Sequence, residues 1–232
     1  MDEGRREIDV TDFRFVQYLT FKTDPAWRRL SNDERQRGRE EFAQELERAD
    51  GIKTYAYSTL GLKPNADLFL WRMSDAPDGL QESLSRLLMT GLGRYLELTN
   101  SLIGLISPST YVRRQDSQEQ AIFEKDRQRY LIVYPFSKTT DWYLMSKEAR
   151  QGMMNEHIRI GHEFPSVRQL LVYSTGLDDQ EFVVSYETED LAAFQQLVIA
   201  LRDTEARRYT LRDTPIFTCV YRPLAETLAL LG

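Results

Sequence analysis

Hydrophobic and polar residues alternate along several short stretches of the chain, a pattern typical of β-strands with one buried face. Alternation predicts strands over residues 13–22, 52–58, 67–73, 129–138, 167–174, 181–187 and 216–222. A charged helix follows the first strand of each half, and further helices are predicted at 79–95 and 190–202. The chain is therefore expected to be an α+β protein with antiparallel sheets.

Segments of the second half repeat segments of the first half. Trp27 and Trp142 begin similar runs 115 residues apart, and the run at Tyr57 resembles the run at Tyr173. The second half reads β-α-β-β-α-β, which is the order of a ferredoxin-like unit. The sequence thus predicts two tandem ferredoxin-like units, whose sheets join back to back or edge to edge. The predicted domains are residues 1–112 and 129–232, separated by a charged, polar linker at 113–128.

Composition narrows the class of protein. The chain has 232 residues, 41% of them hydrophobic, and a net charge of -6, which argues against a protein whose main task is to bind nucleic acid phosphates. Its single cysteine, Cys219, excludes an internal disulfide and a thiolate zinc site. No run approaches the roughly 20 apolar residues of a membrane-spanning helix, and the amino terminus is charged. We therefore expect a cytoplasmic protein that does not enter a membrane.

The two histidines of the chain, His157 and His162, lie in one predicted helix of the second half. Helical spacing places His157 on one apolar face with Met153, Met154, Ile160 and Gly161. A planar macrocycle could lie on this face, with His157 as a nitrogen ligand to its metal, whereas His162 is about 140° away around the helix. The first half has Phe42 near the position of His157. The alternative is that His157 is an ordinary buried core residue.

Three polar residues lie on predicted strands where they could face a ligand. Tyr134 and Lys138 are four residues apart, so both side chains leave the same sheet face, and a phenol beside an ammonium can bind a carboxylate. Gln169 shares an apolar face with Val167 and Leu171, which is costly unless something accepts its hydrogen bonds. The alternatives are solubilising residues at a strand end and an amide that pairs with backbone at a sheet edge.

Three runs of the second half carry a family resemblance: YPFSKTTDWYLMSKEARQGMMNEHIRIG from Tyr134, STGLDDQEFVVSYET from Ser174, and LRDTEARRYTLRDTPIFTC from Leu201. They resemble the chlorite dismutase superfamily, and within it the coproheme decarboxylases and the chlorite-splitting enzymes. The resemblance covers nearly the whole chain. It implies a duplicated ferredoxin-like fold, a non-covalent heme b or iron coproporphyrin III whose iron is held by His157, and a homo-oligomer, often a pentamer and sometimes a dimer.

A few positions distinguish the members of this family. Tyr134 and Lys138 match the Y-P-x-S-K pattern of the decarboxylases, in which the tyrosine becomes the oxidising radical and the lysine assists at the reacting propionate. The residue five before the Ser of the S-x-G-L-D-D run is an arginine in chlorite dismutases and a glutamine in many decarboxylases. Here it is Gln169, and Arg168 should face the other side of the sheet unless the strand is bulged.

The resemblance also implies roles for other residues. Arg202, and Tyr111 from the first half, would bind propionates; Trp142 would line the pocket; and Glu205 would orient His157 through its other ring nitrogen. Met153 would contact the macrocycle. Trp142 and Glu205 could instead be plain core and surface residues.

The resulting prediction is a coproheme decarboxylase that converts iron coproporphyrin III to heme b with hydrogen peroxide, by oxidative decarboxylation of two propionates. Gln169 disfavours chlorite chemistry, because an amide cannot supply the fixed positive charge that would hold a small anion above the iron. Two alternatives remain: a chlorite dismutase, which converts chlorite to chloride and dioxygen, and a non-catalytic heme-binding protein of the same fold.

Overall fold

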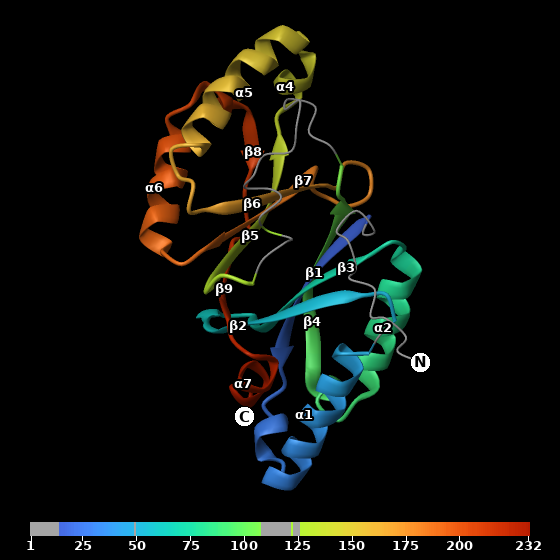
Figure 1. Ribbon diagram of the computed structural model, residues 1–232. Coiled ribbons are helices and arrows are strands. Elements are labelled where there is room, and N and C mark those ends of the chain that lie inside the picture. The colour runs from blue at the N-terminus through green and yellow to red at the C-terminus, as the bar shows by residue number, and fades with distance from the viewer. Residues whose placement is uncertain (1–13, 49, 108–121, 123–125) are drawn as a thin grey trace, which may run out of the picture.

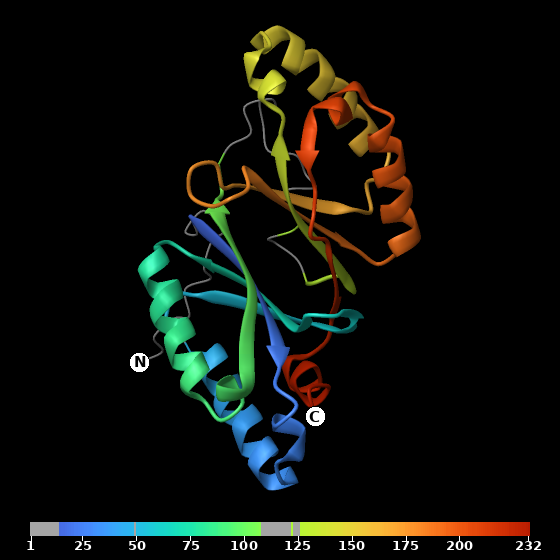
Figure 2. The same ribbon diagram turned by 180° about the vertical axis from the view of Figure 1, so that it is seen from behind.

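The computed structural model describes residues 14–48, 50–107, 122 and 126–232. The strands of the two halves meet in the middle of an elongated molecule, and the long helices lie toward its two ends (Figures 1 and 2). The chain is an α+β protein, as predicted.

The elements of the first half are β1 (Phe15–Thr23), α1 (Asn32–Leu46), β2 (Lys53–Lys63), β3 (Ala66–Ser74), α2 (Pro77–Met89) and β4 (Leu96–Leu105). Those of the second half are β5 (Tyr130–Lys138), α4 (Thr140–Leu144), α5 (Lys147–Gly161), β6 (Arg168–Tyr173), β7 (Phe182–Thr188), α6 (Leu191–Arg202), β8 (Thr210–Arg212), β9 (Phe217–Tyr221) and α7 (Leu224–Ala229). Short 3₁₀ turns cover Trp27–Arg29, Gly93–Tyr95 and Glu205–Tyr209. Each predicted strand is present, with ends that shift by at most five residues.

The predicted helix over 79–95 was wrong at its end. Helix α2 ends at Met89, because Thr90 takes an extended conformation and its side-chain hydroxyl donates a hydrogen bond to the Leu87 carbonyl. The strand β4 that follows was not among the predicted strands.

One antiparallel sheet joins the two halves. Its strand order is β7-β6-β4-β1-β3-β2-β9-β5, and β5 also pairs with β7, so these eight strands close into a barrel, with β8 added beside β5. The seams between the halves are narrow: Leu105 pairs with Tyr173 across β4 and β6, and only two residue pairs join β2 to β9. Of the two arrangements that the sequence allowed, the halves adopt the edge-to-edge one.

The barrel encloses a hydrophobic core to which both halves contribute. Its buried residues are Val16, Tyr18, Tyr57, Phe69, Trp71, Met73, Leu102, Ile122, Leu131, Val133, Leu170, Val172, Val183, Phe217 and Cys219. This shared core stabilises the closed sheet, because each half buries apolar surface against the other. Most of the predicted linker at 113–128 lies outside the described residues.

The helices α1 and α5 start alike and pack differently. Ser31 caps α1 and Ser146 caps α5, each accepting a hydrogen bond from the backbone N–H three residues on, and such a cap contributes about 1 kcal/mol. Helix α1 then buries Gly38 and Phe42 in a packed cluster. No residue of α5 is fully buried. The space beneath α5 is therefore only partly filled, and the candidate site lies there.

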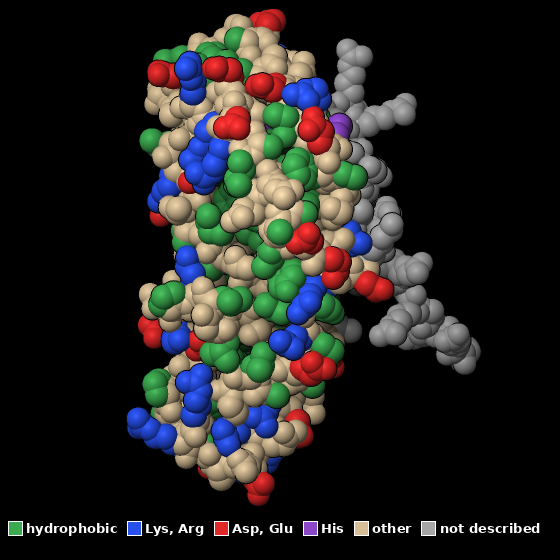
Figure 3. Space-filling model, turned by 90° about the vertical axis from the view of Figure 1, so that its left-hand side faces the viewer, with side chains coloured by type: hydrophobic (Ala, Val, Ile, Leu, Met, Phe, Trp, Pro, Cys, Tyr) green, Lys and Arg blue, Asp and Glu red, His purple; other side chains and the backbone are tan. Residues whose placement is uncertain are grey.

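No helix among the described residues is long and apolar enough to cross a membrane. On the face seen in Figure 3, Lys and Arg side chains are interspersed with Asp and Glu side chains. This face therefore presents no continuous basic surface for a polyanion, in agreement with the net charge of -6.

Candidate active site

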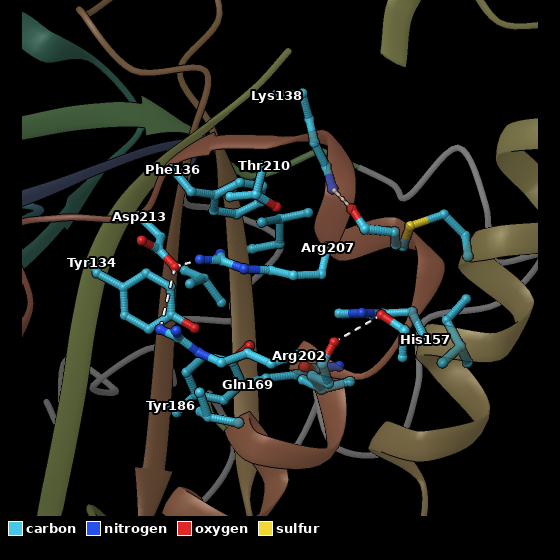
Figure 4. Close-up of a pocket in the computed structure, with 18 residues that line it drawn as sticks. Tyr134, Phe136, Lys138, His157, Gln169, Tyr186, Arg202, Arg207, Thr210 and Asp213 are labelled. Carbon is cyan, nitrogen blue, oxygen red and sulfur yellow. Dashed lines mark hydrogen bonds and ion pairs between the residues drawn. The ribbon is translucent and has the colours of Figure 1, made fainter. Parts of the chain in front are cut away.

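A pocket of about 1120 Å³, its open mouth included, lies between the outer face of the sheet and the helices of the second half. Strands β5, β6 and β7 form one wall, α5 and α6 the others, and the segment after α6 closes one side (Figure 4). The lining residues are Tyr134, Phe136, Lys138, Met154, His157, Ile158, Gln169, Leu171, Val184, Tyr186, Val198, Leu201, Arg202, Thr204, Ala206, Arg207, Thr210 and Asp213. An apolar pocket with a few converging polar groups is the usual form of a small-molecule site.

His157 projects from α5 into this pocket (Figure 4). Burial lowers the pKa of its imidazole from 6.5 to about 4, and the nearby Lys138 ammonium lowers it further in the same direction. The ring is therefore neutral at pH 7, which is the form that ligates a metal. Neither ring nitrogen hydrogen bonds to another residue within the described part of the chain. His157 thus combines a free lone pair with access to the pocket.

Tyr134 lies on β5, across the pocket from α5, with its ring stacked against that of Tyr186 at a centroid distance of 6.1 Å. Burial raises the pKa of the Tyr134 phenol well above 10, and the neighbouring Tyr186 phenol raises it further. Burial raises the pKa of Tyr186 as well. Both phenols are therefore protonated at neutral pH and can give up a proton only together with an electron or to a strong base.

Lys138 reaches the pocket from the end of β5, as its spacing from Tyr134 predicted. Its ammonium donates a hydrogen bond to the Ala206 carbonyl at 3.2 Å and lies 4.5 Å from the centre of the Trp142 ring. Burial, and next the Arg207 charge, lower the pKa of Lys138 from 10.5 to about 8. In Figure 4 the Lys138 side chain does not point toward Tyr134. The structure thus brings Lys138 into the pocket on the side of His157.

The neighbours Arg168 and Gln169 face opposite sides of β6. Gln169 lines the pocket. The Arg168 guanidinium donates a hydrogen bond to the Asp126 carbonyl at 2.9 Å and lies 3.7 Å from the buried Glu187 carboxylate. Strand β6 pairs with β7 without a break, opposing Gln169 to Tyr186. Regular alternation therefore puts the amide, and not the guanidinium, in the pocket.

Two arginines and one carboxylate form the charged corner of the pocket beside Tyr134 (Figure 4). The Asp213 carboxylate oxygen Oδ2 lies 2.6 Å from Nη1 of Arg207 and 3.6 Å from Nη2 of Arg202. Asp213 is the only acidic residue among the described lining residues. The corner therefore carries a net positive charge and suits a carboxylate of a ligand.

Three other residues predicted for the site do not line the pocket, and a fourth is not described. Trp142 is buried behind Lys138 and packs on Tyr209. The methionine that lines the pocket is Met154, not Met153. The Glu205 side chain is 61% exposed and lies 3.5 Å from Arg208, and no hydrogen bond joins it to His157 in the described part of the chain. Tyr111 lies outside the described residues.

The polar side chains of the pocket suit a metal that is already bound in a macrocycle. No cluster of three or more His, Cys, Asp or Glu side chains able to hold a bare ion occurs in the described residues. A single neutral imidazole above an apolar wall instead fits an iron porphyrin, which brings four nitrogens of its own. Arg202 and Arg207 fit the carboxylates of such a group.

The model of the family described as chlorite dismutase matches residues 21–222. The chain belongs to the chlorite dismutase family. Among curated members, it is 31% identical to the coproheme decarboxylase of Mycolicibacterium smegmatis over 70% of either chain. It is 29% identical to the chlorite dismutase of Ideonella dechloratans over 85% of this chain and 72% of that one.

Solved structures of the family share the fold. An arginine-to-lysine variant of the chlorite dismutase from Candidatus Nitrospira defluvii superposes with a TM-score of 0.86 at 30% identity, covering 94% of each chain. The same enzyme in complex with imidazole gives 0.85 at 29% identity over the same shares. Membership of the family and the α+β class with antiparallel strands were thus predicted correctly from the sequence.

Sequence reasoning missed Arg207, Asp213 and Tyr186 as pocket residues. Strand alternation offered a signal for Tyr186, which shares a face with Val184 on β7. Arg207 and Asp213 lie in the segment after α6, which has no regular period, so only the folded chain brings them beside Tyr134.

Proposed function

We propose that the chain is a peroxide-dependent coproheme decarboxylase that converts iron coproporphyrin III to heme b. One observation carries the proposal: Tyr134 and Gln169 line the same pocket as His157, while Arg168 faces away and contacts Glu187. The pocket thus offers a phenol for an oxidative step and lacks the arginine that chlorite chemistry would need on that strand.

Each residue has a role that its surroundings support. His157 would hold the iron through a neutral nitrogen, and Lys138 helps to keep that nitrogen unprotonated by its charge. Arg202 and Arg207 would hold propionates. Tyr134 would stand beside the reacting propionate and give up its phenolic hydrogen, which burial keeps in place at neutral pH. The bound iron porphyrin would supply the oxidising power in the presence of peroxide.

Hydrogen peroxide is the oxidant in the overall reaction and accepts the electrons that each propionate loses. Each reacting propionate loses carbon dioxide, one proton and two electrons and becomes a vinyl group, and one hydrogen peroxide takes up two electrons and two protons and becomes water. Two such events convert coproheme to heme b.

The experiment is a titration of hydrogen peroxide into the purified chain loaded with iron coproporphyrin, followed by mass spectrometry of the porphyrin. Two successive losses are expected, each of carbon dioxide and two hydrogen atoms. Tyr134→Phe should slow both by more than about 100-fold while porphyrin affinity is kept. Tyr130→Phe, on the same strand but outside the pocket, is the matched control. Unchanged turnover in Tyr134→Phe would reject the role of the phenol, and binding without mass loss would reject the decarboxylase.

Chlorite dismutation is the second candidate, favoured by the similarity to the Ideonella dechloratans enzyme over 85% of the chain. We expect no dioxygen from chlorite with the loaded wild-type chain, and a measurable amount with Gln169→Arg, which puts a guanidinium in the pocket. Gln169→Leu is the neutral control. Rapid dioxygen release by the wild type, recorded with an oxygen electrode, would favour this candidate over the decarboxylase.

We also infer that the chain is a tandem of ferredoxin-like units, of which the second holds the ligand, and that it forms a homo-oligomer. The matching strand orders β4-β1-β3-β2 and β9-β5-β7-β6, and the serine caps at Ser31 and Ser146, support the duplication. The assembly is measurable by light scattering coupled to size-exclusion chromatography.

A further inference from the structure

The Asp213 carboxylate lies between the two arginines of the pocket. Its Oδ2 lies 2.6 Å from Arg207 Nη1 and 3.6 Å from Arg202 Nη2, so one oxygen contacts both guanidinium groups. The three side chains border the same space as the Tyr134 ring (Figure 4). Asp213 thus gives the arginine pair an internal carboxylate.

The charges at this corner leave room for one further anion. Arg202 and Arg207 contribute two positive charges, and Asp213 contributes one negative charge. Without Asp213 the corner would attract a ligand carboxylate with both guanidinium groups. With Asp213 present, a ligand carboxylate has to share the arginines with it or displace it from one of them.

We propose that Asp213 is a specificity-determining residue, which competes with the ligand for Arg202 and Arg207 and so limits how tightly the pocket holds a carboxylate beside Tyr134. The inference rests on the proposed function insofar as the ligand is a porphyrin carboxylate. Asp213 would also affect the release of product. A propionate that has lost its carboxylate leaves two arginines behind, and Asp213 neutralises one of them, so the substrate is not held by charge far more tightly than the product.

The test measures binding of metal-free porphyrins and needs neither iron nor peroxide. Coproporphyrin III carries four propionates, and mesoporphyrin IX carries ethyl groups in place of two of them, so the pair isolates the effect of the extra carboxylates. Both are titrated by fluorescence into the wild type and Asp213→Asn. Asparagine keeps the size of the side chain and an oxygen that can accept from Arg207. Glu163→Gln removes an equal charge from an exposed pair with Arg159 and is the matched control.

We expect Asp213→Asn to bind coproporphyrin about tenfold more tightly than the wild type, to bind mesoporphyrin with less than about a threefold change, and to lose the gain in high salt. Arg207→Gln should weaken coproporphyrin binding, and in the double variant Asp213→Asn should give little gain, because the two residues act on one another. Circular dichroism and thermal unfolding establish that each variant is folded.

Equal effects of Asp213→Asn on both porphyrins, or no effect on either, would overturn the role of Asp213 and leave the proposed function intact. Asp213→Glu, which keeps the charge, should behave like the wild type, and a gain in this variant would also overturn the proposal. Failure of the wild type to bind either porphyrin would overturn both the proposed function and this inference.

Discussion

Burial sets the protonation of the residues that face the pocket. It lowers the pKa of His157 to about 4 and that of Lys138 to about 8, and it raises the pKa of Tyr134. All three shifts favour the neutral form, because the sheet and the helices exclude water. At pH 7 the pocket therefore offers a neutral imidazole and a protonated phenol, and Arg202, Arg207 and Lys138, whose pKa remains above 7, carry its positive charge.

The lowered pKa of His157 makes the stability of the chain depend on pH. The unfolded histidine binds a proton below about 6.5, and the folded one only below about 4. Between these values the unfolded state binds more protons, so stability falls as the pH falls from 6.5 toward 4. From pH 7 to pH 5 the wild type should lose about 2 kcal/mol that His157→Leu does not lose. Urea unfolding of both proteins at the two pH values measures the difference, and parallel losses would show that His157 is not buried as a neutral group.

Residues with a period or a motif were predictable, and residues that meet only through folding were not. Helical spacing and strand alternation made His157, Tyr134 and Gln169 candidates, the family resemblance decided for them over their alternatives, and all three line the pocket. Asp213 follows the three-residue strand β8, where no pattern reveals which way a side chain points. The resemblance suggested a contact between Glu205 and His157, but in the structure the Glu205 side chain is solvent-exposed and lies near Arg208.

At the scale of the element, the two faces of β6 have different surroundings, a buried ion pair on one and the pocket on the other. Arg168 points toward the buried Glu187, whose pKa burial raises to about 7 although Arg127 and Arg168 act against the shift. Gln169 points into the pocket. We therefore expect the adjacent residues Arg168 and Gln169 to affect stability and ligand binding, respectively.

Single substitutions on β6 should show this division. Arg168→Gln should lower the free energy of unfolding by about 1–3 kcal/mol, because Arg127 is then the one cationic partner of Glu187 left among the described residues, and it should leave the spectrum of a bound iron porphyrin unchanged. Gln169→Leu should change that spectrum and alter stability by less than about 1 kcal/mol. Chemical denaturation and absorption spectroscopy test both. The reverse assignment of effects would mean that the register of β6 is shifted by one residue.

The two capped helices show what sequence comparison can and cannot reveal. The repeat correctly placed Phe42 of α1 near the position of His157 in α5, because both helices begin at equivalent serines. It did not show that α1 is packed, with Phe42 only 1% exposed, while α5 buries no residue completely. That difference arises from partners distant in sequence, among them Leu228 and Leu231 near the carboxyl terminus, which fill the first half.

At the scale of the whole molecule, closure of the barrel keeps the pocket in shape. The pocket lies outside the barrel, and its wall of β5, β6 and β7 is the outer face of strands whose inner face packs in the shared core. Strand β6 pairs with strand β4 of the first half at one position, Leu105 with Tyr173. Beside this seam, Gly104 allows the two strands to approach closely.

A side chain at Gly104 should therefore weaken the junction of the two halves. An added Cβ would lie 2.6 Å from both Ser174 Oγ and Val172 Cγ1 and 2.7 Å from the Tyr173 carbonyl oxygen, so backbone must move. Gly104→Ala should lower the free energy of unfolding by about 1–3 kcal/mol. It should also disturb the spectrum of a bound porphyrin, because β6 carries Gln169. Gly152→Ala, on the exposed side of α5 with nothing within 4 Å, should instead stabilise by about 0.5–1 kcal/mol. Equal stability of the two variants in urea would show that the seam tolerates a wider spacing, and that the pocket wall does not depend on it.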